Sequence, residues 1–226
     1  MRNRFRRKEQ TDMTDMKGKI ICIGRQYGSG GRETGERLAQ LLGVTCYDKL
    51  LIRQTARETG LSEEIIKSDD EQPIGLACMV SGNPFADSAA LGEAFYSERE
   101  RVYEAERRTI LNIAAKGSCV VIGRCASAIL RDASFDVLSV FIYAGRSDRL
   151  QRIMRRNDVN EKTAAHRLQK IDNLRRQYFD FYAGTAWGAP ESYDLMISTS
   201  RCGIDGAAQI IEKALQMGEE TNGSNR

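Results

Sequence analysis

The sequence predicts an α/β protein in which helices cover both faces of a parallel sheet. Short runs of β-branched and other apolar residues support this fold class, at residues 20–23, 118–124, 136–143 and 193–199. Helical patterns separate these runs, as expected where crossover helices join parallel strands. A glycine-dense basic turn directly follows the first run, and it predicts a ligand loop at the carboxyl edge of the sheet.

The turn covers residues 24–34, Gly-Arg-Gln-Tyr-Gly-Ser-Gly-Gly-Arg-Glu-Thr, between the strand at 20–23 and a helical pattern at 33–42. Its glycines would let main-chain N–H groups close around an oxyanion, and the helix N-terminus would add partial positive charge. A nucleotide is therefore the first ligand to expect. The alternative is a tight strand-to-helix turn that uses glycine only for packing.

This loop departs from the pattern G-x-x-x-x-G-K-[ST], because no lysine follows its glycines. Two alignments stay open. If Gly30 is the last loop glycine, Gly31 takes the lysine position. If Gly31 is the last, Arg32 replaces the lysine and Glu33 replaces the metal-binding hydroxyl. In both alignments a guanidinium, from Arg25 or Arg32, would have to replace the ammonium group.

The remaining helical patterns cover residues 49–59, 61–66, 93–116 and 205–217. Asp48 is expected to cap the helix at 49–59. Residues 68–92 are rich in Gly, Pro and Asp and predict a loop or an irregular insert. The residues at the ends of the apolar runs, Gly24, Arg124, Ala144 and Thr199, should face one crevice, because parallel strands end at the same edge.

A strongly basic segment follows the third run. Its cationic residues are Arg146, Arg149, Arg152, Arg155, Arg156, Lys162, Arg167, Lys170, Arg175 and Arg176. Apolar residues such as Leu150 and Ile153 recur at helical spacing, so one face should pack while the guanidinium groups line another. A solvated helix face is the alternative, but few local carboxylates are available to pair with these arginines.

Composition bounds the remaining possibilities. The chain has 226 residues and a net charge of +3, which fits one large domain or one domain with inserts. The sequence has neither a membrane-spanning run nor an apolar N-terminal segment, so a cytoplasmic location without membrane contact is expected. The six cysteines form no C-x-x-C pair and are expected to be reduced thiols. The basic N-terminus predicts a flexible tail over residues 1–16 rather than a nucleic-acid arm.

The order of these motifs resembles the cytidylate kinase-like family of P-loop proteins, over roughly residues 17–215. The most specific pieces are residues 25–33 and the stretch from Ile171 through Trp187 and Gly188 to Thr199. The resemblance implies a P-loop NTPase fold of three α/β/α layers within a single kinase-like domain at 17–226. Its expected parts are a core (17–46, 117–145 and 190–217), a helical insert for the nucleoside monophosphate (about 47–116) and an arginine-rich helical lid (about 146–189).

The implied activity is transfer of the γ-phosphoryl group of ATP to CMP, dCMP or a related small acceptor, with Mg²⁺. The expected nucleotide-binding residues are Arg25, Gln26, Tyr27, Gly28, Ser29, Gly30, Gly31, Arg32, Glu33 and Thr34. The expected catalytic residues are Arg32, Arg152, Arg155, Arg156, Asp172, Arg175 and Arg176. The expected acceptor-binding residues are Asp48, Arg53, Gly123 and Arg124, and the Mg²⁺ ligands are Ser29, Glu33 and Thr34.

Arg124 resembles the arginine that reaches the monophosphate in cytidylate kinases, although Cys125 stands where that family usually has Asp. Asp172 has the alternative role of a helix pair with Arg175 or Arg176. The alternative function is a nucleotide-binding regulator that kept the fold and lost catalysis. A nucleic-acid-binding role ranks last, because no recognised nucleic-acid module appears. The long helix at 93–116 offers a stripe for a homo-oligomer.

Overall fold

The computed structural model describes residues 18–48, 51, 54, 57, 58, 60 and 88–223, with side chains of the last segment described over 100–217. The expected tail at 1–16, the short helix at 61–66, residues 68–87 of the expected loop and Arg53 lie outside the described residues. Of the expected helix at 49–59, the described positions 51, 54, 57 and 58 are helical.

The sheet is parallel throughout, and its strands run in the order β2-β3-β1-β4-β5. The strands are β1 (Ile20–Arg25), β2 (Thr45–Tyr47), β3 (Cys119–Ile122), β4 (Val137–Tyr143) and β5 (Leu195–Ser198). The apolar runs therefore form β1, β3, β4 and β5, which confirms the predicted fold class. The edge strand β2 has no apolar run of its own and was not predicted.

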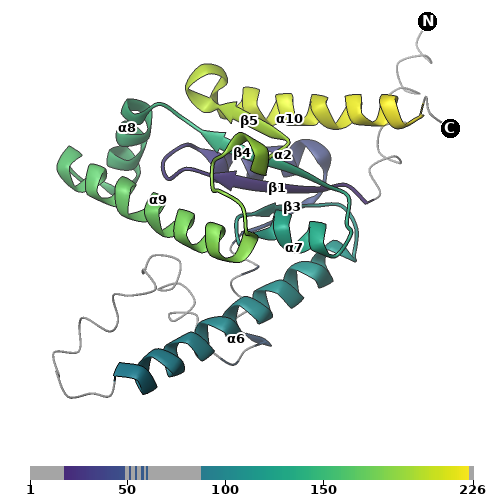
Figure 1. Ribbon diagram of the computed structural model, residues 1–226. Coiled ribbons are helices and arrows are strands. Elements are labelled where there is room, and N and C mark those ends of the chain that lie inside the picture. The colour runs from purple at the N-terminus through teal and green to yellow at the C-terminus, as the bar shows by residue number, and fades with distance from the viewer. Residues whose placement is uncertain are drawn as a thin grey trace, which may run out of the picture.

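Helices cover both faces of the sheet (Figure 1). They are α2 (Gly31–Leu42), α6 (Ser88–Ala114), α7 (Ala126–Asp132), α8 (Arg146–Asn157), α9 (Glu161–Ala183) and α10 (Thr199–Gly223), with a 3-10 turn η1 (Pro190–Ser192). Along β1 the buried side chains alternate: Ile20 and Cys22 join a core with α6, α7 and α9, whereas Ile21 and Ile23 join a core with α2 and α10. The result is the expected three-layer α/β/α arrangement.

Two helices begin well before their predicted starts. Helix α6 begins at Ser88, so residues 88–92, expected within the loop, are helical. Helix α10 begins at Thr199 rather than at 205, because a separate turn of helix follows β5 directly. Gly203, with φ 70° and ψ −175°, breaks the helix there. The predicted helix at 205–217 therefore corresponds to the part of α10 that follows the break at Gly203.

The basic segment forms the helix pair α8 and α9. Helix α8 starts three residues after β4 ends, at the carboxyl edge of the sheet. Leu150 and Ile153 of α8 pack on Ala164 of α9 in a small core of their own. Asn160 caps α9 by accepting the N–H of Thr163. The apolar side chains thus hold the pair together, as their helical spacing predicted.

Candidate functional site

The glycine-rich loop joins β1 to α2 at the carboxyl edge of the sheet. Gly28 and Gly30 have φ of 75° and 83°, a conformation that favours glycine. Gly30 is the N-cap of α2, and its carbonyl accepts both the N–H and the hydroxyl of Thr34. Gly31 is therefore the first helical residue, and Gly30 is the last glycine before the helix.

The amides at the start of α2 are unused by the protein. Four successive main-chain N–H groups donate to no acceptor among the described residues. They belong to Gly30, Gly31, Arg32 and Glu33. A helix N-terminus leaves such donors unpaired and carries partial positive charge, so it favours an anion. This arrangement meets the geometric requirement of a phosphate-binding loop.

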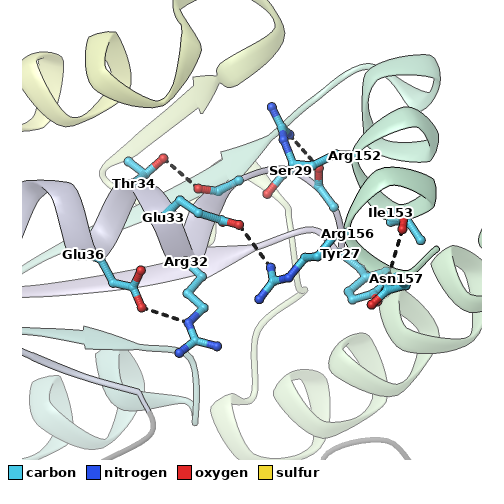
Figure 2. Close-up of polar contacts among 12 residues, drawn as sticks. Tyr27, Ser29, Arg32, Glu33, Thr34, Glu36, Arg152, Ile153, Arg156 and Asn157 are labelled. Atoms are coloured by element: carbon cyan, nitrogen blue, oxygen red, sulfur yellow. Dashed lines mark hydrogen bonds and ion pairs between the residues drawn. The ribbon is translucent and has the colours of Figure 1, made fainter.

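The carbonyl groups of the same loop face the basic helix pair. Arg149 donates through Nε to the carbonyl of Tyr27 at 2.7 Å, and Arg152 donates through Nη1 to that of Gly28 at 2.6 Å. Figure 2 shows Arg152 reaching the loop from α8. From α9, Arg175 donates to the carbonyl of Arg25 at 3.1 Å. These arginines hold the loop through its carbonyl oxygens, which leaves the amides of residues 30–33 for a ligand.

Asp172 joins this contact as an acceptor. Its carboxylate accepts the main-chain N–H of Tyr27 at 2.7 Å and pairs with the guanidinium of Arg149. The two side chains are only 12% and 7% exposed. Asp172 was expected to act in catalysis or to pair with Arg175 or Arg176. The structure pairs it with Arg149, and its part in catalysis stays a proposal. Arg149 is thus a residue of the site that the sequence prediction left out.

The other arginines expected to be catalytic lie in different surroundings. Arg32 pairs with Glu36 at 3.0 Å and with Asp48 at 3.2 Å. Figure 2 shows its side chain directed toward Glu36. Arg156 pairs with Glu33 at 3.1 Å on the surface of the loop. Arg176 lies over the ring of Trp187, and Arg155 is exposed on α8.

The end of β3 has an unusual backbone. Gly123, Arg124 and Cys125 have φ of 78°, 59° and 53°, so three successive residues are left-handed. This conformation is unfavourable for residues with a Cβ, and it tends to persist where a side chain must be held in one direction. The turn places Arg124 beside α6. The strain is consistent with a functional position.

Arg124 is held by a buried carboxylate. Its Nη1 lies 2.6 Å from Oε1 of Glu106, a residue of α6 that is 1% exposed. The hydroxyl of Tyr178 in α9 donates to the other oxygen of Glu106 at 2.7 Å. Burial raises the pKa of Tyr178 well above its usual range, and the Glu106 carboxylate raises it further. The phenol therefore stays a donor, and Glu106 links α6, the end of β3 and α9.

The strand ends meet at one edge, as expected. The hydroxyl of Thr199 donates to the carbonyl of Ser29, and the N–H of Ala144 donates to the side-chain oxygen of Gln26. The N–H of Gly123 donates to the carbonyl of Ile23 next to Gly24. The loop, the Gly123 turn and the basic helix pair thus lie together at the carboxyl edge of the sheet.

The expected Mg²⁺ ligands do not form a cation site by themselves. The hydroxyls of Ser29 and Thr34 donate to the carbonyls of Gln26 and Gly30, and both residues are fully buried. Glu33 is bound to Arg156. The described residues contain no group of three or more His, Cys, Asp and Glu able to hold a metal. A Mg²⁺ ion here would depend mainly on substrate phosphates and water, as Mg²⁺ commonly does.

The described helices include none that combines the length and apolar composition needed to cross a membrane.

The fold and loop define the class of the protein, a P-loop kinase-like protein with a five-stranded parallel sheet. In support of the fold, shikimate kinase from Bacteroides thetaiotaomicron aligns with a TM-score of 0.50 at 12% identity, covering 88% of this chain and 99% of that one. An uncharacterized protein from Eubacterium ventriosum aligns with a TM-score of 0.65 at 27% identity, covering 87% of this chain and 98% of that one.

The family profile that matches residues 20–201 is that of the cytidylate kinase-like family, and the chain belongs to this family. A cytidylate kinase from Pyrococcus horikoshii is 26% identical over 199 residues, which cover 87% of this chain and 88% of the relative. A cytidylate kinase from Thermococcus sibiricus is also 26% identical, over 198 residues, covering 87% of each. The resemblance inferred from the motifs is thereby confirmed.

Proposed function

We propose that the protein is an ATP-dependent phosphotransferase that moves the γ-phosphoryl group of ATP to CMP, dCMP or a related small acceptor. The observation that carries this proposal is the row of unused amides at residues 30–33, at the start of α2. Family membership implies the use of ATP. The relatives named cytidylate kinase support a pyrimidine monophosphate as the acceptor.

In this proposal the amides of the loop hold phosphate oxygens of the nucleotide. Phosphoryl transfer requires mainly positioning and charge neutralisation, which donors held in fixed places supply. Arg149, Arg152 and Arg175 fix the loop through its carbonyls, so they act by positioning. Arg155, Arg156 and Arg176 stay proposed as the charges that approach the phosphates.

Arg124 is the proposed acceptor residue. Its guanidinium is a bidentate donor suited to a phosphate, and the Glu106 carboxylate fixes its direction. Gly123, Asp48 and Arg53 complete the proposed acceptor set. When bound, Mg²⁺ would neutralise phosphate charge; of its proposed ligands, Glu33 is the one whose side chain is not fully buried. The division into core, insert and lid, the homo-oligomer and the cytoplasmic location also stay proposals.

The test is a coupled assay of ADP release with ATP and a panel of nucleoside monophosphates and small alcohols. The proposal expects turnover with CMP or dCMP. Turnover with a small alcohol alone would keep the phosphotransferase and replace the acceptor. Absence of product with every acceptor would overturn the proposal.

One observation favours the alternative, a nucleotide-binding regulator without catalysis. In the alignment set by Gly30, the lysine position is Gly31 and carries no side chain. Loss of one fixed charge costs about 10²–10³ in rate at such sites. Titration calorimetry combined with the ADP-release assay separates the two functions, because a regulator binds ATP in the calorimeter and releases no ADP in the assay.

A further inference from the structure

The loop places an arginine and a glycine in exchanged positions. Gly30 is the N-cap of α2, which selects the alignment in which Gly30 is the last glycine of G-x-x-x-x-G-K. In this alignment the first position of the pattern, normally glycine, is Arg25, and the lysine position is Gly31. The loop therefore has its cation at the beginning and a glycine where the cation is usual.

The side chain of Arg25 lies against the place where a side chain of residue 31 would begin. A β-carbon added to Gly31 would be 2.5 Å from Cβ of Arg25 and 3.1 Å from its Cγ. Real β-carbons do not approach this closely, and the Arg25 Cβ cannot move without the backbone. Arg25 and a side chain at residue 31 thus exclude each other.

The far end of the same side chain reaches the next strand. A β-carbon added to Gly123 would overlap Nη1 of Arg25, which is the movable end of the side chain, so this end lies directly against Gly123. Gly123 directly precedes Arg124 at the end of β3. The side chain of Arg25 therefore extends from Gly31, whose amide is unused, to the turn that carries the proposed acceptor residue.

Arg32, the other arginine of the loop, is held elsewhere. Its Nε lies between the carboxylates of Glu36 and Asp48, at 3.0 and 3.2 Å. The alignment that gives Arg32 the lysine position would also begin the helix one residue later than observed. Arg32 is thus an unsuitable replacement for the lysine.

We propose that Arg25 binds the polyphosphate of the nucleotide in place of the loop lysine, and that residue 31 is a glycine because Arg25 occupies the adjoining space. This inference rests on the proposed function, since it names the cation of the same site. Arginine binds phosphate through a planar fork, so its longer reach from position 25 compensates for the absent lysine at position 31.

The first test is ATP affinity, measured by titration calorimetry on the full chain. Arg25→Gln keeps a polar side chain with the same first three carbons, and it removes the guanidinium with its charge. It should weaken ATP binding about 10- to 100-fold, the loss expected for one charge-assisted contact. Arg37→Ala is the matched control, because Arg37 lies on α2 in a surface pair with Asp205. It should bind ATP as the wild type does. Unchanged affinity in Arg25→Gln would overturn the inference, as would an equal loss in Arg37→Ala.

The second test exchanges the two positions. Arg25→Gly with Gly31→Lys restores the G-x-x-x-x-G-K pattern and removes both close contacts with Arg25, which leaves Cβ of Ile142 at 3.2 Å from the new β-carbon. Each single substitution should weaken ATP binding, Gly31→Lys through the clash with Arg25, whereas the double variant should bind more tightly than either. Circular dichroism confirms folding, and Arg25→Gln replaces Arg25→Gly if that variant fails to fold. If the loss of binding free energy in the double variant equals the sum of the losses in the two single variants, the exchange is contradicted.

Binding does not require turnover, so the two proposals can fail separately. If the wild type binds ATP but forms no product, the phosphotransferase fails while the loss in Arg25→Gln still supports the inference. If the wild type forms product and Arg25→Gln binds ATP normally, the inference alone fails.

Discussion

The carboxylate of Asp172 accepts the main-chain N–H of Tyr27 across 145 residues of sequence. The same carboxylate holds Arg149, which donates back to the carbonyl of Tyr27. One loop residue is thereby fixed at both its donor and its acceptor. The glycine-rich loop and the α8–α9 pair are joined by these hydrogen bonds, so a substitution in one should alter the stability and conformation of the other.

Asp172→Asn tests this unit. It leaves the buried guanidinium of Arg149 without its counter-charge, which typically costs about 3–5 kcal/mol of unfolding free energy. Urea denaturation measures the loss. The matched control is Asp205→Asn. Asp205 pairs with Arg37, which is 44% exposed, so this substitution should lower the unfolding free energy by less than about 1 kcal/mol. Equal losses in the two variants would refute the special role of the buried pair.

Gly28→Ala tests the contact between loop and α8. A β-carbon there would lie 2.9 Å from the carbonyl oxygen of Arg149 and 2.9 Å from Cγ1 of Ile153. The variant should lose stability through its φ of 75° and through overpacking of about 1–3 kcal/mol, and ATP should bind more weakly.

Gly43→Ala is the control for Gly28→Ala. Gly43 has φ 64° and no atom within 4 Å of an added β-carbon, so this variant isolates the cost of the left-handed backbone. Unfolding midpoints and calorimetric affinities of both variants are compared. The contact is disproved if Gly28→Ala costs no more than Gly43→Ala.

The carboxylate of Glu106 should govern acceptor binding through Arg124. Tyr178→Phe removes one hydrogen bond to this carboxylate, a loss of about 1.5–3 kcal/mol for a charged acceptor. Glu106→Gln removes the charge itself. Both should raise KM for CMP with little change in KM for ATP, and Glu106→Gln should do so more. The measurement is steady-state kinetics with ATP and CMP varied in turn. Equal rises in KM for both substrates would contradict a role of Glu106 in acceptor binding.

Buried thiols should make stability fall in alkaline solution. Burial raises the pKa of Cys46 to about 12 and that of Cys119 to about 11, and it raises the pKa of Cys22. Because the folded protein keeps protons that an unfolded thiol with a pKa of 9.0 releases, this stability is complete below pH 9 and is lost as pH rises toward the folded values.

The measurement is the urea midpoint from pH 7 to pH 10 under reducing conditions. Above pH 9, the fully buried Cys22 should contribute a decline of at most about 1.4 kcal/mol per pH unit. Cys22→Ala should lower the midpoint at every pH and flatten its alkaline decline. An identical slope in the variant would show that this thiol does not contribute.

Continuous apolar runs predicted the fold because parallel strands are buried on both faces. The short edge strand β2, Thr-Cys-Tyr, is only half-buried and carries no such signal. The sequence prediction also missed the seven-residue helix α7, for which no helical pattern had been recognised. Residues 88–92 contain Gly92, and this glycine favours a loop in the sequence prediction, whereas α6 already begins at Ser88.

The loop could be located from its glycines, but its contacts could not. Arg149 is one of many arginines at helical spacing, and only the crossing of α8 over the loop distinguishes it. Glu106 lies among other charged residues of a long helix, and its burial depends on Arg124 and Tyr178, which are distant in sequence. The choice between the two loop alignments required the position of the N-cap at Gly30.

The proposal that the amides at residues 30–33 hold the phosphates of a nucleotide can be checked on the amides themselves. The protein is labelled with ¹⁵N and titrated with ATP, and in parallel with adenosine, while the N–H resonances are followed. The resonances of Gly30, Gly31, Arg32 and Glu33 should shift with ATP and stay in place with adenosine. Resonances that do not move at saturating ATP, or that move equally with adenosine, would contradict phosphate binding at this loop.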